Sequence, residues 1–403
     1  MSARLDNILS KYTNPSFENH VPLAIAAVVT RENGLVYLGA AGAKDASVPD
    51  DKVTTDTTLA FYSDTKAVAC TALLQLLERG QIKSIDETVE TYIPEAKNIK
   101  ILQGFDEEDQ PILKDATVKP TIRHLLTHTA GFSYAFFSSH YKKLLDLTGK
   151  PNILLSSWEQ FQTPLIFEPG SEWHYGVNID WVGKIVYNVS GQTLDQFLQE
   201  NVFKQIGAPS LTFTRRPEHY ANQAEIHQRA NCTSGDLIPL KGIHPEVPEF
   251  HAGGHGLWGK LEDYMKFLEI FLHEGKCPST GAVVLKPETV RDYAFSNLLP
   301  KGITCTPNFQ YDQPQLSNPV DLFDLFPKDK MSWTANFFKV DVDLPTGRSA
   351  GSLSWCGLPN LYYWIDPKKG VTGMFCTQLF PFYDKTALEA LTEFETEVYK
   401  QFT

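Results

Sequence analysis

The chain has 403 residues, enough for two or three ordinary domains or for one large two-lobed enzyme. Its hydrophobic share of 42% and charged share of 21% are typical of a globular protein that buries a sizeable core. The formal net charge of −12 argues against nucleic acid or an anionic membrane as a partner, because both attract basic surfaces.

The N-terminal residues include no apolar segment of the kind found in secretory signals, so we expect a cytoplasmic protein. No stretch approaches the roughly 20 apolar residues that a membrane span needs. The six cysteines are scattered, without a Cys-x-x-Cys pair or a metal-like Cys/His spacing. We therefore expect reduced thiols, no metal site and no cofactor.

The first expected element is a β-hairpin over residues 22–42. Residues 22–30 are strand-like, Asn33-Gly34 is a strong two-residue turn signal, and residues 35–39 return. A polar stretch then leads to residues 59–62, which deliver the chain to Ser63.

A buried helix is predicted immediately after Ser63. The run from Ala67 to Arg79 has no interior glycine or proline and is rich in alanine and leucine, which favour helix. Gly80 follows the run, as expected just past a helix C-terminus. Apolar residues surround most of the circumference, which indicates a helix inside the molecule.

Ser63 and Lys66 form a Ser-x-x-Lys pattern at the start of this helix. Residues three apart lie on one helical face, with Cβ atoms roughly 5–6 Å apart. Free backbone N–H groups at a helix N-terminus favour negative charge. A lysine in a dry site can lose its proton, because desolvation disfavours the ammonium form, and can then accept a proton from serine. The pattern therefore predicts a nucleophile and its base.

Four residues alone do not identify such a site. Ser139 and Lys142 have the same spacing, in an aromatic stretch with no long apolar helix behind it. A serine that caps a helix beside a solvated lysine would also give this pattern. The remainder of the chain has to decide between these interpretations.

The middle of the chain, from about residue 67 to 290, is predicted to be mostly helical. Further helices are expected over residues 121–128, 178–189, 193–203 and 261–273. Residues 300–332 are rich in proline, aspartate and asparagine, which indicates a long ordered loop.

The C-terminal part returns to strands and ends in a helix. Strands are expected over residues 337–342, 352–355, 361–365 and 371–378, and a helix over 386–402. Strands at both ends predict an α/β fold, with one sheet built from both termini. We expect a discontinuous sheet domain (1–60 and 300–403), a mostly helical inserted domain (61–299) and an active site in the cleft between them.

Two further stretches carry candidate chemistry. Tyr175 follows the turn Glu168-Pro169-Gly170, and a phenol beside the Ser–Lys pair could transfer a proton to a leaving group, although a core tyrosine is the simpler interpretation. Gly357, near a predicted strand edge, would let a substrate reach backbone N–H groups that stabilise an oxyanion. An ordinary strand-end turn is the alternative there.

Taken together and in this order, the motifs resemble the serine β-lactamase-related superfamily. The chain is most similar to family VIII carboxylesterases, class C β-lactamases and the lovastatin-type acyltransferases of fungal polyketide pathways. The resemblance spans nearly the whole chain and rests on residues 63–66, 127–131, 168–170, Tyr175, 253–256 with Asp263-Tyr264, and 355–358.

This resemblance implies a β-lactamase/transpeptidase-like fold, with an antiparallel sheet flanked by helices and an inserted, mostly helical domain. It implies that Ser63 is acylated and that Lys66 and Tyr175 shuttle its proton. It also implies that the N–H groups of Ser63 and Leu358 form the oxyanion hole, and that the glycine-rich stretch around Gly254 is a loop near the site.

Two departures separate the chain from β-lactamases. Val177 stands where they place an asparagine two residues after the tyrosine, and Trp355-Cys356-Gly357 stands where they carry Lys-Thr-Gly. Both changes remove polar recognition of the β-lactam carboxylate, so we rank an esterase above a β-lactamase.

An apolar ester pocket is expected around these residues. Phe132 and Tyr134 could line it with Trp355, next to Gly357 and Gly254, unless these rings pack the core of the helical lobe. The glycines at 254, 256 and 259 fit a dinucleotide pattern but follow a proline-rich loop rather than a strand, so we set nucleotide binding aside.

The leading hypothesis is therefore a monomeric serine carboxylesterase that cleaves a small-molecule ester of a medium-sized, partly apolar metabolite. An acyltransferase using the same intermediate is the alternative, and the sequence does not separate the two. A β-lactamase or D-alanyl peptidase ranks third. A non-catalytic binding protein that kept the fold is the competing hypothesis from another class.

Overall fold

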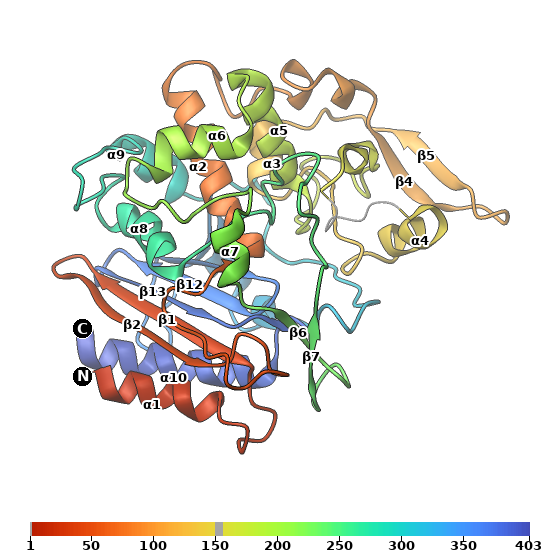
Figure 1. The fold of residues 1–403 in the computed structure, drawn as a ribbon. Coiled ribbons are helices and arrows are strands. Elements are labelled where there is room, and N and C mark those ends of the chain that lie inside the picture. Colours follow the sequence, from red (N-terminus) through yellow and green to blue (C-terminus); the bar gives the residue numbers. More distant parts are fainter. Residues whose placement is uncertain (1, 150–155) are drawn as a thin grey trace.

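A computed structural model describes residues 2–149 and 156–403. Its frame is a seven-stranded antiparallel sheet in the order β2-β1-β13-β12-β11-β10-β9 (Figure 1). The strands are β1 (Leu23–Thr30), β2 (Gly34–Gly42), β9 (Met331–Trp333), β10 (Phe338–Val340), β11 (Ser352–Gly357), β12 (Leu361–Asp366) and β13 (Val371–Cys376). Both ends of the chain therefore build one sheet, and the predicted fold class is confirmed.

Both faces of this sheet are covered, which explains why all eight residues of β1 are buried. Side chains alternate between the faces of a strand. Ile25 and Ala27 accordingly pack into the large core on one side, and Ala24 and Ala26 into a second core on the other. The second core is closed by helices α1 (Ser2–Tyr12) and α10 (Lys385–Phe402), which lie together beneath the sheet (Figure 1).

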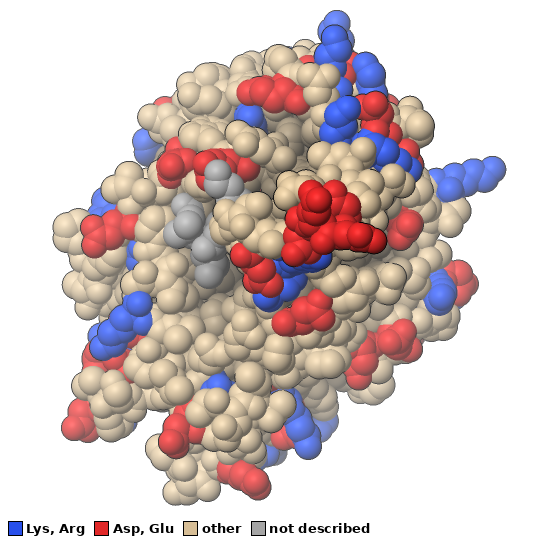
Figure 2. All heavy atoms as spheres, turned by 90° about the vertical axis from the view of Figure 1, so that its right-hand side faces the viewer, with Lys and Arg blue, Asp and Glu red and all other residues tan. Residues whose placement is uncertain are grey.

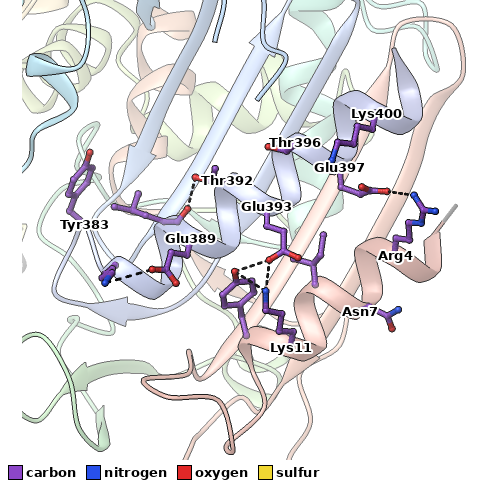
Figure 3. A pocket seen from close by; sticks show the side chains of 14 residues that line it. Arg4, Asn7, Lys11, Tyr383, Glu389, Thr392, Glu393, Thr396, Glu397 and Lys400 are labelled. Atoms are coloured by element: carbon purple, nitrogen blue, oxygen red, sulfur yellow. Dashed lines mark hydrogen bonds and ion pairs between the residues drawn. The ribbon is translucent and has the colours of Figure 1, made fainter. Parts of the chain in front are cut away.

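Ion pairs and a hydrogen bond join α1 to α10 at the protein surface. Lys11 Nζ lies 2.6 Å from a Glu393 carboxylate oxygen, which also accepts a 2.8 Å hydrogen bond from the Tyr12 hydroxyl, and Arg4 lies 3.4 Å from Glu397 (Figure 3). These residues line an open groove along the two helices. The groove lies on the side of the sheet opposite helix α2 (Thr65–Glu78), which follows Ser63 (Figure 1).

The middle of the chain contains most of the helices. They are α2 (Thr65–Glu78), α3 (Ile122–Leu126), α4 (Ser139–Thr148), α5 (Asn178–Ser190), α6 (Leu194–Leu198), α7 (Pro217–Ala221), α8 (Leu261–Leu272) and α9 (Pro287–Thr289). The predicted helices α2, α3, α5, α6 and α8 are confirmed, and a π-helical segment (Gln199–Phe203) extends α6. The sequence analysis did not predict α1, α4, α7 or α9.

Smaller sheets accompany these helices and were not predicted as such. A hairpin of β4 (Lys100–Phe105) and β5 (Pro111–Asp115) projects from the helical part (Figure 1). β6 (Ile226–Arg229), β7 (Leu237–Leu240) and β14 (Leu379–Phe380) form a three-stranded sheet, and β3 (Leu59–Ala60) pairs with β8 (Trp258–Gly259). The long loop predicted over residues 300–332 ends earlier than expected, because the edge strand β9 begins at Met331.

The two-domain division stays a prediction, and helix α8 is the element that bears on it. α8 belongs to the predicted inserted segment 61–299, yet it packs against β1, β12 and β13. Any boundary drawn between the two parts therefore has to place α8 with the sheet.

Figure 2 shows the face that carries the β4–β5 hairpin and α4. Lysine and arginine side chains lie between acidic ones there rather than in one continuous basic patch. Lys143, for example, pairs with Asp109 at 2.5 Å. Among the residues that the structure describes, no helix is both long enough and apolar enough to cross a membrane.

Candidate active site

Ser63 lies in a short 3₁₀ helix (Tyr62–Asp64) that joins β3 to α2. The preceding residue, Tyr62, has a φ of 46°, in the left-handed region that non-glycine residues rarely adopt. Its hydroxyl is hydrogen-bonded to His244 Nε2 at 2.8 Å, and the Phe61 N–H donates to the Leu257 carbonyl at 3.0 Å. These contacts hold the sharp turn that presents Ser63.

Lys66 occupies the first turn of α2 and is 2% exposed. Its Nζ donates to Ser63 Oγ at 3.0 Å, to the Tyr134 hydroxyl at 3.0 Å and to the Gly254 carbonyl at 2.8 Å. Burial lowers the pKa of Lys66 to about 8, against the opposing effect of the Asp180 charge. At pH 7 about one tenth of Lys66 is then neutral, far more than for a lysine with the ordinary pKa of 10.5, and this amine lies within reach of the serine proton.

Tyr175 completes the group around Ser63. The Lys66 Nζ lies 4.7 Å from the centre of the Tyr175 ring, and Trp355 Nε1 donates to the Tyr175 hydroxyl at 2.9 Å. Burial raises the pKa of Tyr175 well above its usual value, while hydrogen bonds with Ser63 and Trp355 oppose that rise. The phenol therefore stays protonated and can donate to a leaving group.

The end of β11 closes against the Ser63 turn. A Cβ atom added to Gly357 would lie 2.7 Å from the Phe61 carbonyl oxygen, so only glycine allows this approach. The approach brings Leu358 into the same cavity as Ser63. This is the arrangement expected if the two backbone N–H groups act on one oxyanion.

The cavity at Ser63 is apolar. Tyr175, Trp355, Cys356 and Leu358 contribute to its wall. The other lining residues come from segments distant in the sequence and are all apolar, namely Phe136, Phe137, Phe309, Val320, Leu322, Phe323 and Phe382. Of the residues described as lining this cavity, none carries a charged side chain.

The family to which this fold belongs is decided by comparison of the whole sequence. Residues 15–395 match the family model described as Beta-lactamase. The chain belongs to the β-lactamase family.

Relatives within the β-lactamase family include enzymes of acyl transfer and ester cleavage. Monacolin J acid methylbutanoyltransferase of Aspergillus terreus is 31% identical over 356 residues, which cover 86% of this chain and 83% of the relative. Lovastatin esterase of Penicillium rubens is 26% identical, with 86% of each chain covered. The unliganded structure of simvastatin synthase from Aspergillus terreus superimposes with a TM-score of 0.82 at 27% identity, covering 100% of this chain and 98% of the other. The chain is therefore an enzyme with the serine ester-hydrolase or acyl-transfer chemistry of this family.

Not every residue predicted to bind substrate lies in the cavity of this β-lactamase family member. Phe132 is fully buried and stacks on Trp181 with ring centres 5.1 Å apart, so it packs in the core, the alternative given for it, and does not line this cavity. Tyr134 contacts Lys66 through its hydroxyl, and the Gly254 carbonyl binds the same lysine. Of the predicted set, Trp355 is the side chain that lines the cavity.

Other residues of the site were missed by the sequence analysis. Phe309 and Phe323 come from the segment 300–332, which was predicted to be a long ordered loop, and their only signal was an aromatic residue among prolines and aspartates. Asn178, the asparagine next to the expected position, is hydrogen-bonded to His128 Nδ1 at 3.1 Å instead of to Ser63 or Lys66. Asp180, fully buried on α5, was not considered at all.

The second Ser-x-x-Lys pattern has a different environment. Ser139 is exposed at the start of α4, and Lys142 Nζ pairs with Asp146 at 2.6 Å. Lys142 is therefore paired with a carboxylate at the surface rather than with a serine hydroxyl in a buried cavity.

Proposed function

We propose that this chain is a serine carboxylesterase that cleaves the ester of a medium-sized, partly apolar metabolite through an acyl-enzyme on Ser63. The observation that carries the proposal is the 3.0 Å contact between Lys66 Nζ and Ser63 Oγ in a cavity with apolar walls. A monomer would suffice for this reaction, because every proposed residue comes from one chain.

Acylation follows from the positions of three side chains. Neutral Lys66 accepts the Ser63 proton as Oγ attacks the ester carbonyl carbon. The backbone N–H groups of Ser63 and Leu358 stabilise the resulting oxyanion. The carbon–oxygen bond to the alcohol then breaks, and Tyr175 protonates the leaving oxygen while the proton held by Lys66 restores the phenol.

Deacylation repeats these steps with a second nucleophile. Water gives up a proton to the Tyr175–Lys66 pair and attacks the acyl carbon. The bond from that carbon to Ser63 Oγ then breaks, Oγ takes the proton back from the pair, and the carboxylic acid leaves. An alcohol in the place of water would release a new ester. Acyl transfer is therefore the second candidate, and the identity with the methylbutanoyltransferase of Aspergillus terreus favours it. A β-lactamase ranks third, because Val177 and the uncharged cavity wall offer no partner for a carboxylate.

The proposal is tested by intact mass measurement during turnover of a small ester panel. We expect a mass increase equal to the acyl group, mapped to the peptide that contains Ser63, followed by its decay. Adding an increasing concentration of a small alcohol at a fixed ester concentration then separates the two candidates. Constant acid release supports the esterase, and acid release replaced by new ester supports the transferase. An ester that turns over without any adduct on Ser63 would contradict both.

The hydrogen bond from Trp355 to Tyr175 predicts a moderate effect of Trp355→Phe. The phenyl ring keeps the apolar wall but lacks the N–H donor, which leaves the Tyr175 hydroxyl less well oriented and the phenolate form less stable. A neutral hydrogen bond contributes about 1 kcal/mol. We therefore expect kcat/KM for ester cleavage to fall by about fivefold.

Trp364→Phe is the matched control for this variant. Trp364 lies on β12 and is buried in the core between the sheet and α10, away from Tyr175. We expect this control to retain the wild-type kcat/KM. Equal losses in the two variants would show that Trp355 contributes only to packing.

A further inference from the structure

The carboxyl group of Asp180 is linked to the Lys66 amine through hydrogen bonds to one intervening residue. Asp180 belongs to the first turn of α5, and its side chain is fully buried. Its Oδ1 accepts a 2.7 Å hydrogen bond from the Gly254 N–H. The carbonyl of the same glycine accepts the 2.8 Å hydrogen bond from Lys66 Nζ. Gly254 therefore connects the carboxylate to the lysine.

Glycines allow the close approach that this connection needs. A Cβ atom at Gly254 would lie 2.8 Å from Asp180 Oδ1, and one at Gly253 would lie 2.4 Å from the Ile179 carbonyl oxygen. Side chains at either position would push the loop away from the start of α5. The glycine-rich stretch thus lets the backbone approach a buried carboxylate, which gives it a role unrelated to nucleotide binding.

Asp180 is also the strongest charged neighbour of Lys66. Its negative charge opposes the burial that lowers the lysine pKa to about 8, and Lys66 opposes the burial that raises the pKa of Asp180 to about 6. Three further titratable groups raise the Lys66 pKa: Asp64, Cys70 and Cys356. The remaining titratable groups near the Asp180–Lys66 pair are His128, Tyr134, Tyr175 and His255.

We propose that Asp180 is a positioning residue for the reaction at Ser63. Through Gly254 it fixes Lys66 Nζ against Ser63 Oγ, and through its charge it sets the pH range over which Lys66 can accept the serine proton. In the acylation step the proton passes from Oγ to Nζ, and Asp180 neither gives nor takes one. This inference rests on the proposed function, because it assumes that Lys66 is the base.

Asp180→Asn separates the two effects. The amide oxygen of asparagine can still accept from the Gly254 N–H, so the loop keeps its place while the charge is lost. We measure the rate at which a fluorophosphonate labels Ser63 as a function of pH. In the wild type this rate should rise with pH through the Lys66 pKa, at about 8. In Asp180→Asn the rise should move to lower pH by about one unit, because the ammonium form has lost its neighbouring charge.

Asp263→Asn is the matched control. Asp263 is a buried aspartate on α8 that also accepts a backbone N–H, from Ser210 at 2.9 Å, and it pairs with Lys266 rather than Lys66. The pH profile of Ser63 labelling in Asp263→Asn should match that of the wild type. If Asp180→Asn does not fold, Asp180→Ser, which is smaller and also uncharged, gives the same prediction.

The outcomes distinguish this inference from the function it rests on. A profile that keeps its midpoint in both Asp180 variants, whatever the loss of rate, would show a purely structural role and overturn the inference alone. A midpoint that moves to higher pH would overturn it as well. Failure of the fluorophosphonate to label Ser63 in the wild type at any pH would overturn the proposed function instead.

Discussion

Replacing Ser63 with alanine is expected to lower kcat for ester cleavage by about 10⁵-fold or more, as removal of an enzyme's nucleophile does. The methyl group leaves Lys66 with no serine hydroxyl to deprotonate at the cavity wall. Backbone N–H groups and the cavity would remain and would support only weak residual catalysis. The measurement is the rate of p-nitrophenyl ester hydrolysis, combined with intact mass after incubation with a slow ester, in which the acyl adduct should be absent.

Ser139→Ala is the matched control for this prediction. It removes the other serine with a lysine three residues later, but that serine is exposed and lies beside Gln310 rather than a buried base. We expect Ser139→Ala to hydrolyse p-nitrophenyl esters at the wild-type rate. One other hydroxyl contacts Lys66, that of Tyr134. An adduct that persists in Ser63→Ala and maps to Tyr134 would contradict the assignment of the nucleophile.

The parts of the fold that follow from local signals were predictable. The hairpin of β1 and β2 was predictable, but residues 31–33 connect its strands rather than a two-residue turn at Asn33-Gly34, because Gly34, with a φ of 65°, already pairs with Thr30. The alanine- and leucine-rich run that ends before Gly80 forms α2, because helix propensity and the glycine C-terminus act within a few residues. The Ser63–Lys66 contact belongs to the same class, since three-residue spacing near a helix start places the two side chains together.

The parts that depend on contacts distant in the sequence were not predictable in the same way. Phe132 and Phe309 are both aromatic, and only the path of the loop over residues 300–332 decides that the second faces Ser63 while the first stacks in the core. Asp180 reaches the Lys66 site through Gly254, 74 residues away in the chain. From the sequence, Asp180 is an acidic residue in the first turn of a helix, and such a residue is ordinarily solvated.

Helix α1 was not predicted, although its sequence carries the spacing of an amphipathic helix. Leu5, Ile8, Leu9 and Tyr12 follow the i, i+3, i+4, i+7 spacing of an amphipathic helix and are all buried against α10 and the sheet. Helix α1 was therefore predictable from sequence alone.

Lys66→Met is expected to remove activity and to change how stability depends on pH. Methionine is close to lysine in size but cannot accept the Ser63 proton, and loss of a general base costs about 10²- to 10⁴-fold in rate. In the wild type, the unfolded chain holds the Lys66 proton up to its usual pKa of 10.5, whereas the folded protein releases it at about 8. Between these values the unfolded state binds more protons, so the free energy of unfolding rises with pH.

The methionine variant lacks this rise. The difference in free energy of unfolding between Lys66→Met and wild type should therefore move in favour of the wild type from about pH 8 to pH 10.5, by at most about 3 kcal/mol. Urea unfolding at several pH values measures it. Lys142→Met, which removes a half-buried lysine paired with Asp146 away from Ser63, should retain the wild-type rate. A constant difference between Lys66→Met and wild type over this range would mean that Lys66 titrates as an ordinary lysine, and the buried amine could not then act as the base near neutral pH.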